Sequence, residues 1–132
     1  MSEEAKVSKV EVEKAGSRQL RGTIAEELDP STECFSGSNT GFLKHHGTYQ
    51  QDDRDERGGT SEDGQKKGKS YMMMVRSRIP GGQLTADDLL AELDMCDEFG
   101  NGTLRITTRQ GLQLHGVLKN DLKPKIRAIN AK

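Results

Sequence analysis

Five polar side chains alternate with apolar ones between residues 104 and 115, in a pattern suited to binding an anion. Arg105, Thr107, Arg109, Gln113 and His115 occupy odd positions, and leucine and isoleucine occupy most of the even ones. Because side chains alternate across a strand, the five polar groups share one face. Guanidinium groups bind carboxylates in bidentate fashion. With two arginines and no acid, this face suits a planar ligand that carries several carboxylates.

The loop that turns this segment decides which polar residues meet. A three-residue loop at 110–112 pairs Arg109 with Gln113 and keeps the polar and apolar residues on separate faces. The same loop places Thr107 opposite His115. An unbroken bent strand would also keep the polar residues on one face and the apolar residues on the other. The alternative interpretation is a solvated outer face of an antiparallel sheet, which commonly shows such alternation.

A second pair of arginines lies in the β-rich run 71–79. Arg76 and Arg78 fall on the face opposite Val75 and Ile79, where two guanidinium groups two residues apart suit a small oxyanion. Charge protection of an edge strand explains the same spacing equally well.

Other possible ligands are better explained without a metal. The three methionines at 72–74 are expected to pack in the core or at its edge, and His45 and His46 have no nearby acid or cysteine to complete a site. Cys34 and Cys96, the only cysteines, are too few for a zinc or iron–sulfur site. We expect two reduced thiols in a cytoplasmic protein and no metal held by this chain.

The elements that position these residues follow from the second half of the sequence. A strand over 71–79 ends at Pro80-Gly81-Gly82, because proline lacks the ladder donor and glycines favour a turn. Thr85 is expected to cap a helix with its apolar face on Leu89, Leu90, Leu93, Cys96 and Phe99, followed by Gly100 at the C′ position. A strand region over 103–117 and a closing helix with Leu122, Ile126 and Ile129 complete the order β-α-β-β-α. This order predicts an α+β fold, an incomplete ferredoxin-like half-domain over residues 71–132.

The first half, residues 1–70, is predicted to be an extended polar arm that packs on something else. Only 21–28 is expected to be helical, with Thr23 as N-cap and Glu26 at the capping-box position. The stretch 52–70 is almost entirely charged residues, glycine and serine, so it is interpreted as a flexible linker.

Composition excludes several functional classes. The 132 residues are 31% hydrophobic and 31% charged, and the net charge of −1 argues against a nucleic-acid binder. No apolar run approaches the roughly 18 residues of a membrane span, and the first residues have no apolar signal region.

Four separated runs, 20–28, 46–55, 75–82 and 102–116, resemble the assimilatory sulfite and nitrite reductases in that order. The resemblance covers residues ~7–132 and implies an enzyme with sirohaem and a [4Fe-4S] cluster that performs the six-electron reduction of sulfite to sulfide or of nitrite to ammonia. It implies that Arg76 contacts the oxyanion. It assigns the sirohaem carboxylates to a set comprising Arg105, Thr107, Thr108, Arg109, Gln113 and His115.

The resemblance also sets limits. The family's four cluster cysteines lie in its carboxy-terminal half and are missing here, so an inactive amino-terminal part is expected that needs the rest of the reductase. Sulfite is favoured over nitrite, and the electron donor is a ferredoxin or a flavoprotein. The alternative is a non-catalytic ferredoxin-like binding module that pairs with a partner chain. Neither a nucleic acid nor a membrane is expected as a partner.

Overall fold

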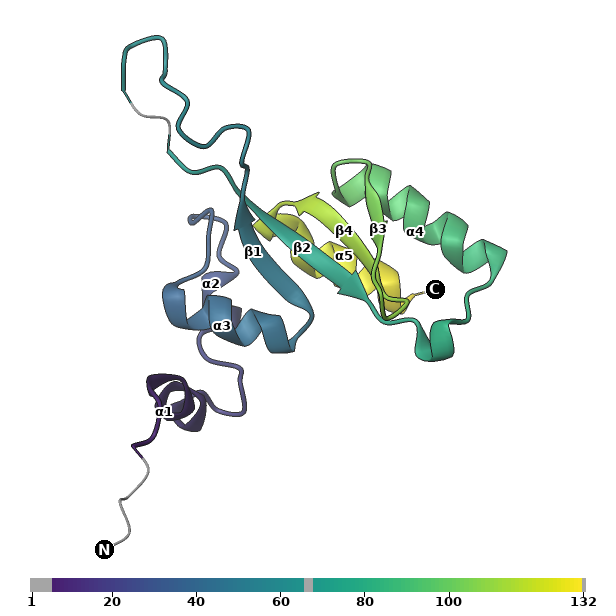
Figure 1. Ribbon diagram of the computed structural model, residues 1–132, viewed down its shortest axis with the longest axis horizontal. Coiled ribbons are helices and arrows are strands. Elements are labelled where there is room, and N and C mark those ends of the chain that lie inside the picture. Colours follow the sequence, from purple (N-terminus) through teal and green to yellow (C-terminus); the bar gives the residue numbers. More distant parts are fainter. Residues whose placement is uncertain (1–5, 66–67, 132) are drawn as a thin grey trace, which may run out of the picture.

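Four antiparallel strands form one sheet in the order β1-β2-β4-β3 (Figure 1). A computed structural model describes residues 6–65 and 68–131. The strands are β1 (Thr48–Asp52), β2 (Tyr71–Ser77), β3 (Leu104–Ile106) and β4 (Leu112–Val117). The helices are α1 (Lys9–Gly16), α2 (Ile24–Glu27), α3 (Gly37–His45), α4 (Ala86–Phe99) and α5 (Leu122–Asn130), with short 3₁₀ turns η1 (Pro80–Gly82) and η2 (Lys119–Asp121).

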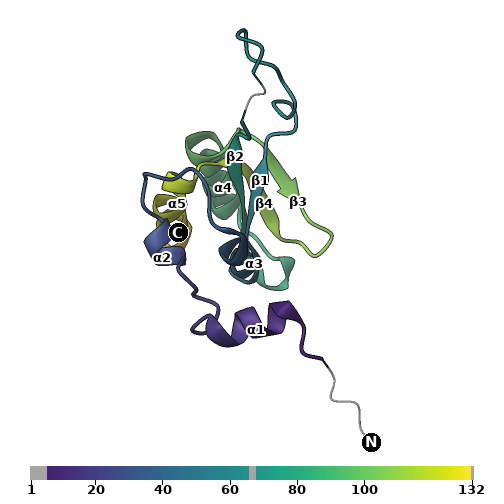
Figure 2. The same ribbon diagram turned by 90° about the vertical axis from the view of Figure 1, so that its left-hand side faces the viewer.

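From residue 71 onward the elements run β2-α4-β3-β4-α5, which confirms the predicted order β-α-β-β-α. Helices α4 and α5 lie on the same side of the sheet (Figure 2). The core lies between the helices and the sheet, where buried side chains of β2 and β4 meet those of α4. Its fully or almost fully buried members from these elements are Met73, Val75, Met95, Cys96, Leu114 and Val117.

The turn after β2 and the start of α4 are as predicted, although β2 ends at Ser77, two residues before the predicted end of the strand. The chain turns at η1, where Gly81 and Gly82 adopt positive φ. The Thr85 hydroxyl accepts a hydrogen bond from the Asp88 amide, and the Asp88 carboxylate accepts one from the Thr85 amide. This reciprocal capping box satisfies two donors that an uncapped helix would leave without partners.

The predicted apolar face of α4 is correct for Cys96 and Phe99, which meet the core, but wrong for its three leucines. Leu89, Leu90 and Leu93 are 39%, 59% and 43% exposed, whereas Met95 and Cys96 enter the core. Apolar residues lie on more than one side of this helix, so their spacing alone does not decide which side meets the sheet. Contact with β4 decides it.

The segment before residue 71 contributes more than an extended arm. Strand β1 pairs with β2 along its whole length, from Thr48 opposite Val75 to Asp52 opposite Tyr71. Phe35 also joins the core cluster. The sequence missed this because the segment is too polar to predict burial by itself, and its few apolar residues are buried only against a sheet formed later in the chain.

Two details of the predicted arm need correction. Helices α1 and α3 were not expected, and the helix predicted over 21–28 spans only α2. The Thr23 hydroxyl makes no capping hydrogen bond; it bonds to the carboxylate of Glu27 rather than forming a box with Glu26.

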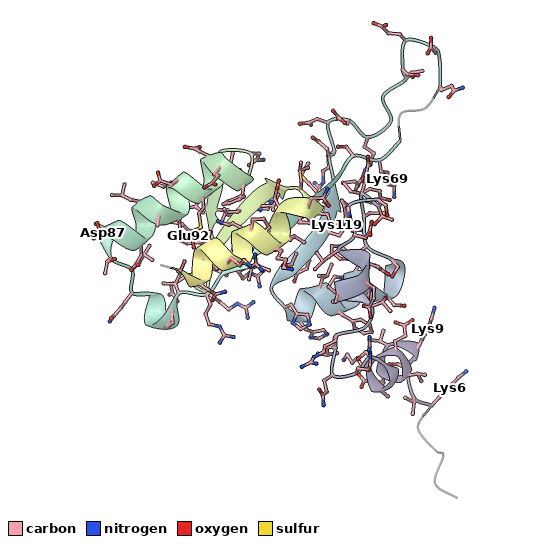
Figure 3. The ribbon with its side chains drawn as sticks, turned by 180° about the vertical axis from the view of Figure 1, so that it is seen from behind. Lys6, Lys9, Lys69, Asp87, Glu92 and Lys119 are labelled. Carbon is pink, nitrogen blue, oxygen red and sulfur yellow. The ribbon has the colours of Figure 1, made fainter. Side chains whose placement is uncertain are left out.

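A buried lysine ties this early segment to the start of α5 (Figure 3). The Lys119 ammonium, on a side chain only 3% exposed, donates to the carbonyls of Glu27 and Asp29 at 2.7 and 2.8 Å and to the Thr32 hydroxyl. A buried ammonium needs such partners to offset its desolvation. Lys119 therefore connects the residues at and just after the end of α2 to the sheet domain by hydrogen bonds.

Within the described residues, no helix is both long enough and apolar enough to cross a membrane.

Candidate anion-binding groove

A row of three polar side chains crosses the sheet face opposite α4 and α5. Gln113 of β4 lies directly opposite Arg76 of β2 and, on its other side, opposite Arg105 of β3. Residues directly opposite in an antiparallel pair point to the same face. With its amide oxygen turned toward Arg76, Gln113 accepts hydrogen bonds from that guanidinium at 2.9 Å (Nη2) and 3.3 Å (Nε). The two predicted groups of arginines therefore meet at one residue.

This row opens into a groove of about 840 Å³ with a strongly positive lining. Its basic side chains are Lys44, Arg76, Arg78, Arg105 and Arg109. No aspartate or glutamate of the described residues lines it. Five cations without an acid cannot neutralise one another, so the groove is suited to an anionic ligand.

The loop between β3 and β4 forms one end of the groove. Thr107 and Gly111 close it by two hydrogen bonds, one between their backbones at 2.8 Å and one from the Gly111 amide to the Thr107 hydroxyl oxygen at 2.9 Å. A Cβ on Gly111 would lie 3.2 Å from that oxygen, so the position favours glycine. Thr107 is thus half-buried and partly engaged in the turn, while Thr108 and Arg109 are exposed on the loop.

The predicted three-residue loop at 110–112 is wrong, because five residues, 107–111, connect the strands. Gln113 consequently faces Arg105 rather than Arg109. The register differs from the prediction by an even number of residues, so the polar residues keep one face. Pairing beyond Ile106 would need a tighter turn, and the bonds between Thr107 and Gly111 stabilise the wider one.

His115 lies in an adjoining hollow rather than in the groove itself. The two hollows share Arg105 and Ile106 and therefore meet along β3. Burial, and secondly the Arg105 guanidinium, lower the pKa of His115 below its usual value. Its Nε2 is buried and has no hydrogen-bond partner among the described residues. Buried polar atoms are normally hydrogen-bonded, so the unpartnered nitrogen makes His115 a candidate ligand-binding residue.

The adjoining hollow has a balanced charge, unlike the groove. Asp52, Asp53 and Asp55 line it together with Arg54 and Arg57, and Arg105 borders it from β3. Arg57 is bound to the Asp52 carboxylate through Nε at 2.7 Å and through Nη2, which lowers the pKa of Asp52. The net positive charge is therefore concentrated at the Arg76 end.

The end of α3 supplies groove residues that the sequence did not single out as ligands. Lys44, His45 and His46 line the groove, and Gly47 brings them to β2 by accepting a hydrogen bond from the Arg76 amide at 2.9 Å. Nothing in the local sequence relates these residues to Arg105, some sixty positions later. The His46 ring contacts the Leu20 carbonyl at 3.0 Å, which agrees with the expectation that it is not a metal ligand.

No metal site accompanies the groove in the part of the chain that the structure describes. No group of three or more histidine, cysteine or acidic side chains there lies close enough to hold an ion. Cys34 and Cys96 are both free thiols, and Cys96 is buried in the core.

Fold and groove together define a class: an α+β half-domain of ferredoxin-like type with a groove lined by basic side chains on one sheet face. Residues 64–132 match the family described as "Nitrite/Sulfite reductase ferredoxin-like half domain". The chain belongs to this nitrite and sulfite reductase family.

Curated relatives and a solved structure agree with that assignment. The chain is 48% identical over 125 residues to a sulfite reductase (NADPH) hemoprotein beta-component of Myxococcus xanthus, covering 94% of this chain and 22% of that protein. It is 45% identical over 133 residues to the protein of the same name from Staphylococcus haemolyticus, covering 98% and 23%. The solved structure of Mycobacterium tuberculosis NirA superimposes on 94% of this chain and on 24% of the NirA chain, with a TM-score of 0.71. The two sequences are 22% identical over this match, so the likeness shows the fold alone. The chain spans about a fifth of the length of these curated relatives.

Proposed function

We propose that this chain is the amino-terminal part of a sirohaem-dependent sulfite reductase and supplies the cationic side of its active site. The observation that supports this proposal is the groove lined by five basic side chains and no acid. In this proposal the complete enzyme reduces sulfite to sulfide, and the remaining polypeptide completes the site. The division into an early segment, residues 1–70, and a half-domain, residues 71–132, belongs to the same proposal, with β1 of the early segment extending the sheet of the half-domain.

The groove fits the carboxylates of a sirohaem. Arg105 and Arg109 would each bind a carboxylate, with Thr107, Thr108 and Gln113 as additional hydrogen-bonding groups and His115 at the adjoining end. Gln113 is half-buried beside Arg105, and the Nε2 atom of His115 is buried without a hydrogen-bond partner among the described residues. When bound, sirohaem supplies the electron transfer, and the chain binds and orients it.

Arg76 is the residue we assign to the oxyanion. It is half-buried in the groove, and its guanidinium donates two hydrogen bonds to Gln113. A cation held in place before the substrate arrives stabilises developing negative charge without reorganisation. Sulfite, an oxyanion with several acceptor oxygens, suits this guanidinium.

A [4Fe-4S] cluster does not fit on this chain. Such a cluster needs four thiolates, whereas this sequence has two cysteines and one of them is in the core. We therefore place the cluster ligands in the remainder of the reductase.

Sulfite is preferred to nitrite because the curated relatives carry the name sulfite reductase. Their names also include NADPH, which favours a flavoprotein over a ferredoxin as the electron donor.

A chimera tests the proposal. The matching first fifth of the Myxococcus xanthus hemoprotein would be replaced by this chain and the product purified from cells that make sirohaem. A sirohaem absorbance spectrum together with sulfite reduction driven by methyl viologen supports the proposal. A folded, colourless and inactive chimera would instead indicate a non-catalytic binding module.

A further inference from the structure

Tyr49 is in contact with two of the five groove cations. Its ring centroid lies 5.7 Å from Cζ of Arg76 and 5.9 Å from Nζ of Lys44. Tyr49 is on β1, opposite Met74 of β2, and strand alternation puts it on the same sheet face as Arg76. The adjacency of β1 and β2 is visible in Figure 1.

The Tyr49 ring lies close enough to both cations to attract them. Lys44 and Arg76 both line the groove, and no carboxylate of the described residues accompanies them there. The negative face of an aromatic ring attracts cations within about 6 Å of its centroid. One ring therefore lowers the cost of keeping two like charges together.

Three separate groups contact Arg76. Gln113 accepts from its guanidinium, Gly47 accepts from its backbone amide at 2.9 Å, and the Tyr49 ring lies beside the guanidinium carbon. An arginine fixed in this way loses less conformational entropy when it binds an anion.

We propose that Tyr49 is a positioning residue, which holds Arg76 and Lys44 together so that both contact one sulfite oxyanion. The proposal deepens the function proposed above and rests on it. Tyr49 acts through the two cations; it is not itself assigned a contact with substrate.

Isothermal titration of the full chain with sodium sulfite tests this inference. The variants are Tyr49→Phe, Tyr49→Leu, and a chain with pentafluorophenylalanine at position 49, which keeps the size of the ring but removes the negative charge of its face. The control is Tyr71→Leu, because no cation lies over the Tyr71 ring among the described contacts. Circular dichroism confirms folding for each variant.

Tyr49→Phe is expected to bind sulfite as the parent does, whereas the leucine and pentafluorophenylalanine variants should bind about twofold to fivefold more weakly. In an Arg76→Ala, Lys44→Met background, Tyr49→Leu should have no further effect. If the pentafluorophenylalanine chain binds sulfite as tightly as Tyr49→Phe, the positioning role is overturned. If Arg76→Ala, Lys44→Met itself leaves sulfite affinity unchanged, the proposed oxyanion site fails instead, whatever the Tyr49 variants do.

Discussion

Gln113 joins Arg76 and Arg105 across three adjacent strands, directly opposite each of them. Its amide oxygen accepts two hydrogen bonds from the Arg76 guanidinium. This single residue therefore links the arginine assigned to the oxyanion with an arginine assigned to the cofactor carboxylates. The arrangement predicts how each of them responds to substitution.

Gln113→Glu should abolish most sulfite binding. The new carboxylate would form an ion pair with Arg76 and cancel the charge that attracts the anion. Calorimetric titration of the full chain is expected to show at least roughly tenfold weaker binding, equivalent to about 1.4 kcal/mol. Gln113→Met, which has similar length and no charge, is the matched control and should lose less affinity. Equal affinity in Gln113→Glu and the parent would contradict the assigned position of the oxyanion.

Arg76→Ala in the chimera should separate substrate binding from cofactor binding. Sirohaem content is expected to stay unchanged, while sulfite turnover falls by roughly 10²-fold, as on loss of one preorganised donor. Absorbance per polypeptide and methyl viologen oxidation measure the two quantities. Loss of sirohaem with normal turnover per haem would assign Arg76 to the cofactor.

Arg105→Ala should raise the pKa of His115. Burial and the nearby guanidinium both lower that pKa, with burial as the larger cause, so removing the arginine moves it back only part of the way toward 6.5. An imidazole whose pKa is lowered on folding costs stability as pH falls from 6.5 toward the folded-state pKa, because the unfolded chain binds more protons there. NMR titration of the His115 ring measures the shift. An unchanged pKa would mean that the two side chains do not interact.

Lys119→Met should detach the early segment from the sheet domain. Two backbone carbonyls and a threonine hydroxyl would lose their buried donor, which is expected to lower the free energy of unfolding by about 2–3 kcal/mol. Lys123→Met, on the exposed side of α5, is the control and should change stability little. Urea unfolding followed by circular dichroism compares them. Similar stabilities would show that the Lys119 contacts contribute nothing to docking.

Residue alternation and turn chemistry predicted much of the second half. The alternation that runs from Arg105 to His115 correctly placed Arg105 and Gln113 on one face, because an even change in register preserves parity. The length of the loop was not predictable, since the hydrogen bonds between Thr107 and Gly111 depend on the folded turn. The contribution of Lys44 to the groove depends on β1 pairing with β2, a contact between distant segments that no local pattern encodes.

A titration of the full chain with sirohydrochlorin, the metal-free ring of sirohaem, tests whether this sheet face binds the cofactor by its carboxylates. NMR spectra would follow the amides and the arginine side chains as the ring is added. We expect shifts at Arg105, Arg109, Gln113 and His115, and we expect these shifts to be lost in the doubly substituted chain Arg105→Ala, Arg109→Ala. Shifts confined to the α4 and α5 side of the sheet, or equal binding by the doubly substituted chain, would contradict this expectation.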